Sequence, residues 1–355
     1  MAILIKLVER EVPPYMFVAI PVIAFLLAFA IGAILMMWAG VNPLLGYSAF
    51  LRGSLGTPAA VIDSLVRMTP FLLMATGIAF SNRVGVLNIG AEGQYIIGAI
   101  TTTWVTLALQ QVVSPGLSIT ASIVLAIIMG GLWAAFAGVL KAYLGINEIV
   151  TTVIMNWLAF KLLQWLLRGP LKSPTAQMWP MSPPLTATLP YIIPGAGLHA
   201  GFLIAVAVAV MAYYLLFRTN FGFKFRVTGA NPEVATYAGY DVRKFVLFSI
   251  AFSGALAGLA GAGEVLGVFH FLYEGIAVGL GYTAIIVALV GKNHPLAIIP
   301  SAFMFGVIYN GVVYLQSATG LTYTFSKAIE GLIYLFVLLS EVFVLYRVKV
   351  IKVGE

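Results

Sequence analysis

The sequence predicts an all-α integral membrane protein with about ten transmembrane helices. We expect two inverted pseudo-repeats with broken helices and both termini in the cytoplasm. Three observations support this prediction. The 355-residue chain is 61% hydrophobic and 9% charged, and its mean hydropathy is +1.04. Its apolar runs have about the length that a helix needs to cross a bilayer. Its basic residues gather on alternate connections between these runs.

Ten apolar runs fit membrane spans. They cover residues 15–39, 60–81, 88–112, 117–140, 147–168, 199–217, 244–268, 276–291, 295–316 and 326–346. The first run exceeds the roughly 7–15 apolar residues of a secretory signal, so we expect it to be retained as a span. Glycine and polar residues interrupt the third and eighth runs, which leaves their depth in the membrane open.

The basic residues test this count. With a cytoplasmic N-terminus and alternating spans, 13 of the 19 Lys and Arg residues face the cytoplasm, 4 face outward and 2 lie within spans. The cytoplasmic set is Lys6, Arg10, Arg83, Lys141, Arg218, Lys224, Arg226, Arg243, Lys244, Lys292, Arg347, Lys349 and Lys352. The outward set is Arg52, Arg168, Lys172 and Lys327. This bias agrees with the enrichment of Lys and Arg on cytoplasmic loops, so it supports ten spans.

A single transmembrane domain over residues 1–355 is therefore expected. After the first span its parts are a first half at 60–168, an external loop at 169–198, the sixth span at 199–217, a cytoplasmic loop at 218–243 and a second half at 244–346. Prolines make the external loop stiff and extended. It is either a rigid cover with interfacial aromatic residues or a contact surface for an external partner.

Two segments break their spans. The first is Asn88-Ile-Gly-Ala-Glu-Gly-Gln-Tyr95, and the second is the glycine-rich stretch from Gly275 to Ala284. Irregular backbone at membrane depth persists only where protein buries it or where it lines a wet cavity. Ionisable residues at such places are functional candidates. The two segments occupy similar places in the two halves, which suggests the inverted repeats that are typical of transporters.

Other embedded polar residues have two interpretations each. Asp63 and Arg67 share a helix face and form either a neutralising pair near a membrane surface or a gate or substrate contact. Asn156 either bonds a neighbouring helix or faces a pore. Small residues between Ser253 and Gly263 predict close helix packing.

The chain lacks the motifs of several enzyme classes. It has no cysteine and only three histidines, and its Gly291-Lys292-Asn293 lacks the hydroxyl and glycine spacing of a phosphate-binding loop. We therefore expect no catalytic site, no metal site and no ATP site on this chain.

The cytoplasmic loop at 218–243 is a basic island between two apolar spans. Asn231 and Pro232 predict the start of a short helix, because Asn is a good N-cap and Pro is favoured at the first helical position. A structured helix on the cytoplasmic side is a docking surface for a soluble partner.

Two motifs in this sequence resemble a known family. Asn88-Ile-Gly-Ala-Glu-Gly-Gln94 and Gly229-Ala-Asn-Pro-Glu-Val-Ala-Thr-Tyr-Ala-Gly239 are similar to segments of ABC importer permease subunits for simple sugars, nucleosides and branched-chain amino acids. The first motif is closest to the nucleoside-type branch. The resemblance extends over about residues 15–345.

The resemblance implies partners and cofactors. Residues 229–239 would form the coupling helix, which sits in a groove of a cytoplasmic ATPase, with Tyr237 as its anchor. The residues expected to couple to the ATPase are Gly229, Asn231, Pro232, Ala235, Tyr237, Ala238 and Gly239. ATP and Mg²⁺ would bind on that partner. A related second permease would complete the pore, and an extracytoplasmic lipoprotein would deliver the substrate to this multi-pass protein of a prokaryotic plasma membrane.

The resemblance also points to a substrate pathway. The expected pathway residues are Asn88, Glu92, Gln94 and Asn156. Amides suit a neutral ribosyl ligand, although Glu92 could instead hold the broken backbone through nearby amide groups. Only Tyr95 and Trp104 supply aromatic rings beside the motif. The alternatives are a permease for branched-chain amino acids and an ion-coupled secondary transporter that uses Glu92 or Asp63 as an ion ligand.

Overall fold

A computed structural model describes residues 2–9, 13, 16–175, 179–193, 195 and 197–353. Arg10 and Tyr15, which the sequence predictions include, lie outside these residues. So do residues 176–178, 194 and 196 of the external loop.

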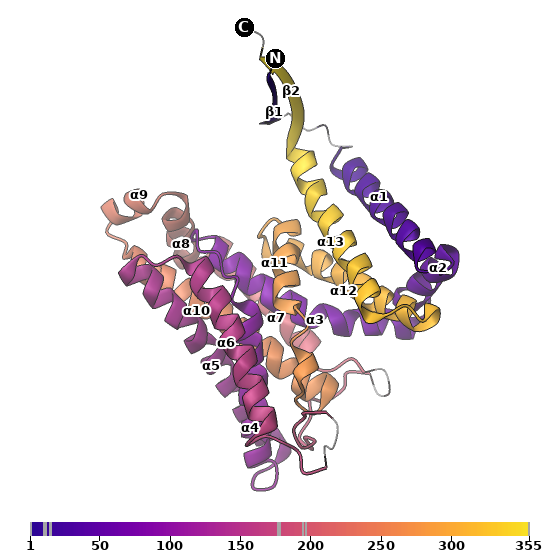
Figure 1. The fold of residues 1–355 in the computed structure, drawn as a ribbon. Coiled ribbons are helices and arrows are strands. Elements are labelled where there is room, and N and C mark those ends of the chain that lie inside the picture. Colours follow the sequence, from indigo (N-terminus) through magenta and orange to yellow (C-terminus); the bar gives the residue numbers. More distant parts are fainter. Residues whose placement is uncertain are drawn as a thin grey trace. The chain divides into compact units, whose positions relative to one another are not determined.

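Helices make up most of the described chain (Figure 1). The longer ones are α1 (Met16–Trp38), α3 (Pro58–Asn82), α4 (Ala91–Leu109), α5 (Pro115–Leu144), α6 (Glu148–Arg168), α7 (Gly201–Arg218), α10 (Val242–Glu264), α12 (Pro295–Thr319) and α13 (Tyr323–Leu345). The shorter ones are α2 (Pro43–Ser54), α8 (Asn220–Ala230), α9 (Pro232–Tyr237), the π-helix η1 (Val265–Phe269), the 3₁₀ helix η2 (Glu274–Ile276) and α11 (Leu280–Val290). The strands are β1 (Ala2–Glu9) and β2 (Tyr346–Val353).

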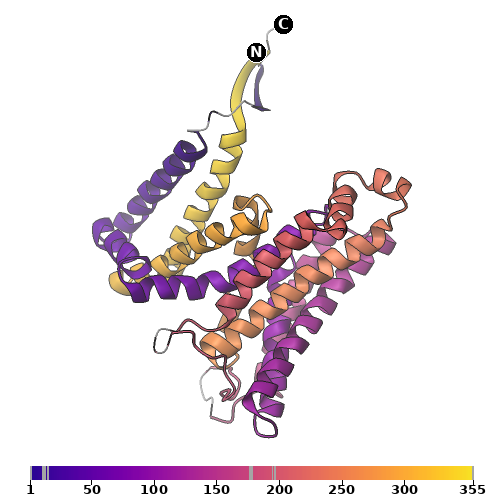
Figure 2. The same ribbon diagram turned by 180° about the vertical axis from the view of Figure 1, so that it is seen from behind.

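The chain forms two compact units. One comprises Met1–Ala60 and Ile308–Glu355, and the other comprises Val61–Val307. In the first unit α1 lies beside α13 (Figure 2). Strands β1 and β2 pair antiparallel, with Ala2 opposite Val353. The all-α prediction missed this pair, which brings the two ends of the chain together. The alternation of apolar and polar residues over residues 346–350 of β2 is the strand pattern that could have indicated it.

The second unit is built around α10, which packs on α4 and α5. Glycines allow these helices to approach closely. A Cβ added to Gly258 would lie 2.2 Å from the carbonyl oxygen of Ala126, and one added to Gly98 would lie 2.3 Å from that of Gly258. Small residues at helix contacts let backbones meet within a membrane. The structure thus confirms the predicted packing role of the small residues at 253–263.

Within the described residues, seven helices are long and apolar enough to cross a membrane. They cover Ala19–Trp38, Pro58–Asn82, Pro115–Leu144, Glu148–Arg168, Gly201–Arg218, Val242–Phe269 and Pro295–Thr319. The third, eighth and tenth predicted spans also contain helices, namely α4, α11 and α13. However, the 11 residues of α11 extend only about 16 Å, so this helix is too short to cross a bilayer alone. The depth of the eighth span, which the sequence left open, therefore stays a prediction.

The connections of the second unit meet in two groups. Arg83 donates to the backbone oxygen of Asn293 at 2.9 Å, which joins two loops that were predicted to lie in the cytoplasm. Arg168 forms a 2.6 Å ion pair with Glu274, which joins two segments that were predicted to lie outside. This grouping is the one that alternating spans require.

The external loop is held against the residues that follow α10. Backbone N–H groups of Ser182 and Leu185 donate to Leu272 and His270, both at 2.8 Å. Leu189 donates to Leu266 at 2.9 Å. These bonds anchor the described part of the proline-rich loop, as the rigid-cover interpretation predicts. The contact with an external partner stays a prediction.

Candidate functional site

The polar residues before α4 form a closed hydrogen-bond network. The Nδ2 of Asn88 donates to Gln94 Oε1 and to Ser253 Oγ, both at 2.8 Å. The Oδ1 of Asn88 accepts from the backbone N–H of Gly90 at 2.9 Å and from Gln94 Nε2 at 3.0 Å. Asn88 and Gln94 are buried. Their bonds brace the irregular backbone ahead of α4, because buried polar groups need partners.

Glu92 connects the two broken segments. Its Oε1 accepts from the backbone N–H of Gly279 at 2.8 Å, and its Oε2 accepts from that of Gly281 at 2.6 Å. The carboxylate therefore caps the N-terminus of α11, where a negative charge is favourable. A Cβ on Gly281 would lie 2.3 Å from the backbone nitrogen of Glu92, so this close approach requires glycine. Glu92 holds the broken backbone, which was one of its two predicted roles.

Asn156 joins α6 to both segments. Its Oδ1 accepts from the backbone N–H of Gly93 at 2.8 Å. Its Nδ2 donates to the backbone oxygen of Ile89 at 2.9 Å and to the hydroxyl of Tyr282 at 3.1 Å. The interhelical bonding predicted for Asn156 is thus present. Asn156 also borders a pocket, and its position in a pore stays a prediction.

A pocket of about 200 Å³ opens beside these bonds. Its lining residues are Glu92, Ile96, Asn156, Trp157, Phe160, Ala277, Gly279 and Tyr282. Two of the four predicted pathway residues, Glu92 and Asn156, therefore line the pocket. Asn88 and Gln94 are not among its lining residues and instead bond to each other.

The aromatic residues of the pocket were missed by the sequence analysis. Tyr95 is fully buried and does not line the pocket, and neither does Trp104. The aromatic rings that line the pocket are those of Trp157, Phe160 and Tyr282. Their sequence signals were adjacency to Asn156 for Trp157, and a position inside the second broken segment for Tyr282.

The pocket offers few polar groups. The carboxylate of Glu92 already accepts two backbone bonds, and the amide of Asn156 is engaged on both of its atoms. The hydroxyl of Tyr282 accepts from Asn156, so its own hydrogen can be donated into the pocket. This arrangement suits a flat, uncharged ligand that stacks on rings and makes a small number of hydrogen bonds.

The predicted coupling residues lie on α8, α9 and the turn that follows. Asn231 separates the two helices, and its Oδ1 accepts from the backbone N–H groups of Glu233 at 3.0 Å and Val234 at 3.1 Å. Pro232 occupies the first turn of α9. The predicted helix start is therefore confirmed. Gly229 lies in α8, where a Cβ would be 1.8 Å from the backbone oxygen of Arg83.

The rest of α9 divides into a buried and an exposed side. Ala235 is buried, whereas the side chain of Tyr237 is 93% exposed. Ala238 ends the helix, and Gly239 adopts a φ of +78° in the turn that follows. Residues with positive φ are mostly glycines, because other side chains are strained there. An exposed aromatic ring on a well-capped helix is available to a partner.

Comparison with known proteins identifies the class of this multi-pass protein. Residues 60–339 match the family described as "Branched-chain amino acid transport system / permease component". The chain belongs to this family, whose members are permease subunits of ABC transporters. It is accordingly a transport component of the plasma membrane, and it has no ATPase site of its own.

The relatives of this chain include permeases for a simple sugar and for nucleosides. A glucose ABC transporter permease from Haloferax volcanii is 32% identical, over 96% of this chain and 92% of the relative. A guanosine ABC transporter permease from Bacillus subtilis, NupP, is 31% identical, over 90% of this chain and 92% of the relative. A second guanosine permease of that organism, NupQ, is 29% identical over 68% of this chain and 78% of the relative. No solved structure matches the chain.

Proposed function

We propose that this chain forms the translocation pathway for nucleosides in an ATP-driven importer, with simple sugars as the second candidate class. The pocket between the two broken segments is the observation that supports this proposal most directly. It combines the rings of Trp157, Phe160 and Tyr282 with the donor hydroxyl of Tyr282. The relatives that transport guanosine and glucose agree with both classes.

The lining of the pocket favours a nucleoside over the alternatives. A nucleobase stacks on aromatic rings whatever its identity, and the hydroxyl of Tyr282 can donate to an oxygen of the ribose. An amino acid would need a partner for its carboxylate and another for its ammonium group. Glu92 is the acidic residue of the lining, and its two oxygens already accept from Gly279 and Gly281. An ion-coupled mechanism would use the same carboxylate as an ion ligand, but both of its oxygens already accept hydrogen bonds from backbone N–H groups.

The sidedness of the chain follows from its charges. We place both termini and residues 218–243 in the cytoplasm, because 13 of the 19 basic residues then face inward. The pairing of β1 with β2 supports a common side for the two ends. The contact of Arg83 with Asn293 supports a common side for their two loops.

Three partners follow from this assignment. A cytoplasmic ATPase, which holds ATP and Mg²⁺, receives α9 with the exposed Tyr237. A related but different permease forms the other half of the pore, and an extracytoplasmic lipoprotein delivers substrate to the side of the external loop. The heterodimer is supported by the two guanosine permeases of Bacillus subtilis, because this chain matches a larger share of its length to NupP than to NupQ.

The first test uses the purified complex of this chain with its ATPase, second permease and receptor in proteoliposomes. ATP hydrolysis and uptake are measured with nucleosides, pentoses, glucose and branched-chain amino acids. We expect stimulation by receptor loaded with a nucleoside. Stimulation by sugars alone would select the second class. Uptake by this chain alone under an ion gradient would overturn the proposal.

The second test changes the pocket. Trp157 and Trp165 both lie on α6 and are both 63% exposed, but only Trp157 is among the residues that line the pocket. We expect Trp157→Ala to raise the substrate concentration for half-maximal uptake about tenfold, because one stacking surface is worth about 1–3 kcal/mol. Trp165→Ala is the matched control and should leave this concentration unchanged. Equal effects of the two substitutions would remove the pocket from the pathway.

A further inference from the structure

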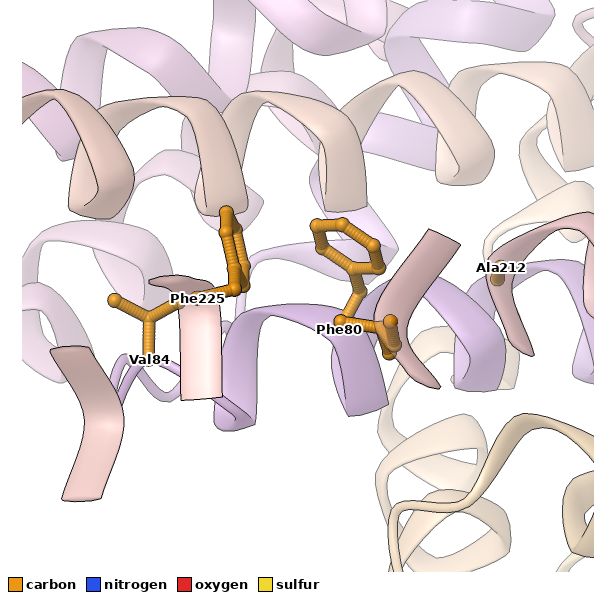
Figure 3. Close-up of a cluster of buried hydrophobic side chains, with 5 residues drawn as sticks. Phe80, Val84, Ala212 and Phe225 are labelled. Atoms are coloured by element: carbon orange, nitrogen blue, oxygen red, sulfur yellow. The ribbon is translucent and has the colours of Figure 1, made fainter. Parts of the chain in front are cut away.

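Six phenylalanines join α8 to two membrane helices. The phenylalanine cluster comprises Phe80 of α3, Phe221 and Phe225 of α8, and Phe245, Phe248 and Phe252 of α10. Figure 3 shows Phe225 and Phe80 in the buried core of this region, with Val84 and Ala212 nearby. The ring centroids of Phe80 and Phe225 are 4.7 Å apart, and those of Phe80 and Phe252 are 4.4 Å apart.

The attachment of α8 is tight at both of its ends. Near its C-terminal end the backbone of Gly229 rests on the carbonyl of Arg83, with no room for a Cβ. Near its N-terminal end Gly222 packs on the last turn of α7, where a Cβ would lie 2.2 Å from the carbonyl oxygen of Leu215. Close-packed interiors transmit displacement because their side chains cannot rearrange freely. A shift of α8 must therefore displace α3 and α10 through the rings between them.

The residue after Phe252 continues this connection toward the pocket. Ser253 accepts a 2.8 Å hydrogen bond from Nδ2 of Asn88. A Cβ on Gly77 would lie 2.9 Å from the carbonyl oxygen of Ser253, so α3 and α10 are in backbone contact at this level. Through its Oδ1, Asn88 holds the backbone N–H of Gly90, directly before α4 begins.

The last step leads from the start of α4 to the pocket lining. Glu92 lies on the first turn of α4 and binds Gly279 and Gly281. It lines the pocket together with Asn156. A series of ring contacts, hydrogen bonds and short backbone segments thus runs from α8 to the pocket, and all of it lies within the unit of residues 61–307.

We propose that the phenylalanine cluster and the Ser253–Asn88 hydrogen bond carry the movement of the ATPase-bound segment to the substrate pocket. This inference rests on the proposed function, because it takes α8 and α9 as the segment that the ATPase moves. Coupling between distant sites passes through packed side chains and hydrogen-bond networks. Ser253 is in this scheme a positioning residue, which acts on the pocket through Asn88.

A matched pair of serines tests the role of Ser253. Ser249 lies one turn earlier on α10, is equally buried, and bonds only its own helix through the backbone oxygen of Val246 at 2.7 Å. We expect Ser253→Ala to reduce the ratio of substrate-stimulated to basal ATP hydrolysis about fivefold to tenfold, since it leaves a buried amide hydrogen without its acceptor. Ser249→Ala should keep the wild-type ratio.

The ratio separates coupling from folding. Thermal melting of the purified complex records any loss of stability, and a purely structural serine would lower the melting temperature without changing the ratio. An unchanged ratio in Ser253→Ala, or an equal fall in Ser249→Ala, would overturn the proposal. If the wild-type complex shows no stimulation by any loaded receptor, the proposed function fails instead.

A double-mutant cycle tests whether the two parts of the connection act together. Phe225→Leu loosens the cluster at α8, and Ser253→Ala breaks the bond at Asn88. If both lie on one connection, the double variant should lose little more stimulation than the stronger single variant. Losses that multiply would mean independent sites and would contradict the proposal. Phe248→Leu serves as the second cluster variant if Phe225→Leu does not assemble.

Discussion

The pocket and the segment of α8 and α9 use similar residues for opposite purposes. Around the pocket, Asn88, Glu92 and Asn156 are buried and bond to groups of the same chain. At the start of α9 the side chain of Asn231 accepts from the backbone of the helix that it caps, and the side chain of Tyr237 is exposed. Buried polar groups that are hydrogen-bonded to each other stabilise the backbone around them, whereas an exposed side chain on a capped helix can bind a partner protein. Stability should therefore depend on the first region and assembly on the second.

The largest loss of stability is expected at Glu92. Glu92→Gln keeps the size of the side chain but places an NH₂ group against one of two backbone donors. Hydrogen bonds to a charged acceptor contribute about 1.5–3 kcal/mol each, so at least one such contribution is lost. We expect a lower melting temperature and uptake reduced at least tenfold.

An exposed carboxylate provides the control for Glu92. Asp241 forms a 3.2 Å ion pair with Lys244, and their side chains are 48% and 78% exposed. Exposed pairs of this kind contribute little to stability, because water screens the two charges. Asp241→Asn should consequently have a small effect on the melting temperature, and equal losses of stability in the two variants would contradict the special role of the Glu92 brace.

The next largest effect is expected for His199, just beyond the external loop. Its imidazole packs on Gly267, and its Nδ1 accepts from the backbone N–H of Gly201 at 3.2 Å. Burial, and secondly the charge of His270, lower the pKa of His199 from 6.5 to about 4. The unfolded chain therefore binds the proton more readily than the folded chain between these two pH values.

The sign of the pH dependence follows from this difference. The contribution of His199 to stability is complete above pH 6.5 and is lost as the pH falls toward 4, by about 3 kcal/mol in total. Melting temperatures of wild type and His199→Gln between pH 7.5 and about 4.5 measure it. The variant should show a shallower slope in this window, and identical slopes would contradict the assignment.

Gly239 should show a smaller effect than His199. Its φ of +78° is strained for other residues, at a cost of about 1–2 kcal/mol in the left-handed region. A Cβ would meet no atom within 4 Å, so Gly239→Ala measures the cost of the positive φ without adding a steric clash. We expect a modest fall in stability and weaker binding of the ATPase, measured by co-purification. Gly145, which has a φ of +68° and also open space, is the control for the strain alone.

The smallest effect on stability, and the sharpest test of the comparison, is expected at Tyr237. Because its side chain is 93% exposed, Tyr237→Ala should change the free energy of unfolding by less than about 0.5 kcal/mol. The same variant should lose co-purification with the ATPase and substrate-stimulated hydrolysis. The exposed Tyr214 of α7 is a control outside the coupling segment. Retained assembly in Tyr237→Ala would remove this residue as the anchor.

Much of the fold was accessible to sequence reasoning because its signals are local. Apolar length predicts spans, and Asn231 with Pro232 predicts the start of α9. Two of the four proposed pathway residues line the pocket. The other two were chosen because they are polar and embedded, but polarity does not reveal whether an amide faces a cavity or another amide. Asn88 and Gln94 do the latter.

The sequence by itself determined the helices, the alternation of basic loops and the family, because these depend on neighbouring residues and on the bilayer. The tertiary structure alone decided which distant groups meet. Glu92 bonds Gly281 across 189 positions, and Asn156 bonds Tyr282 across 126. The antiparallel pairing of β1 with β2 joins the two ends of the chain. Such contacts arise from the packing of whole helices and strands, and no periodic pattern in one segment encodes its partner.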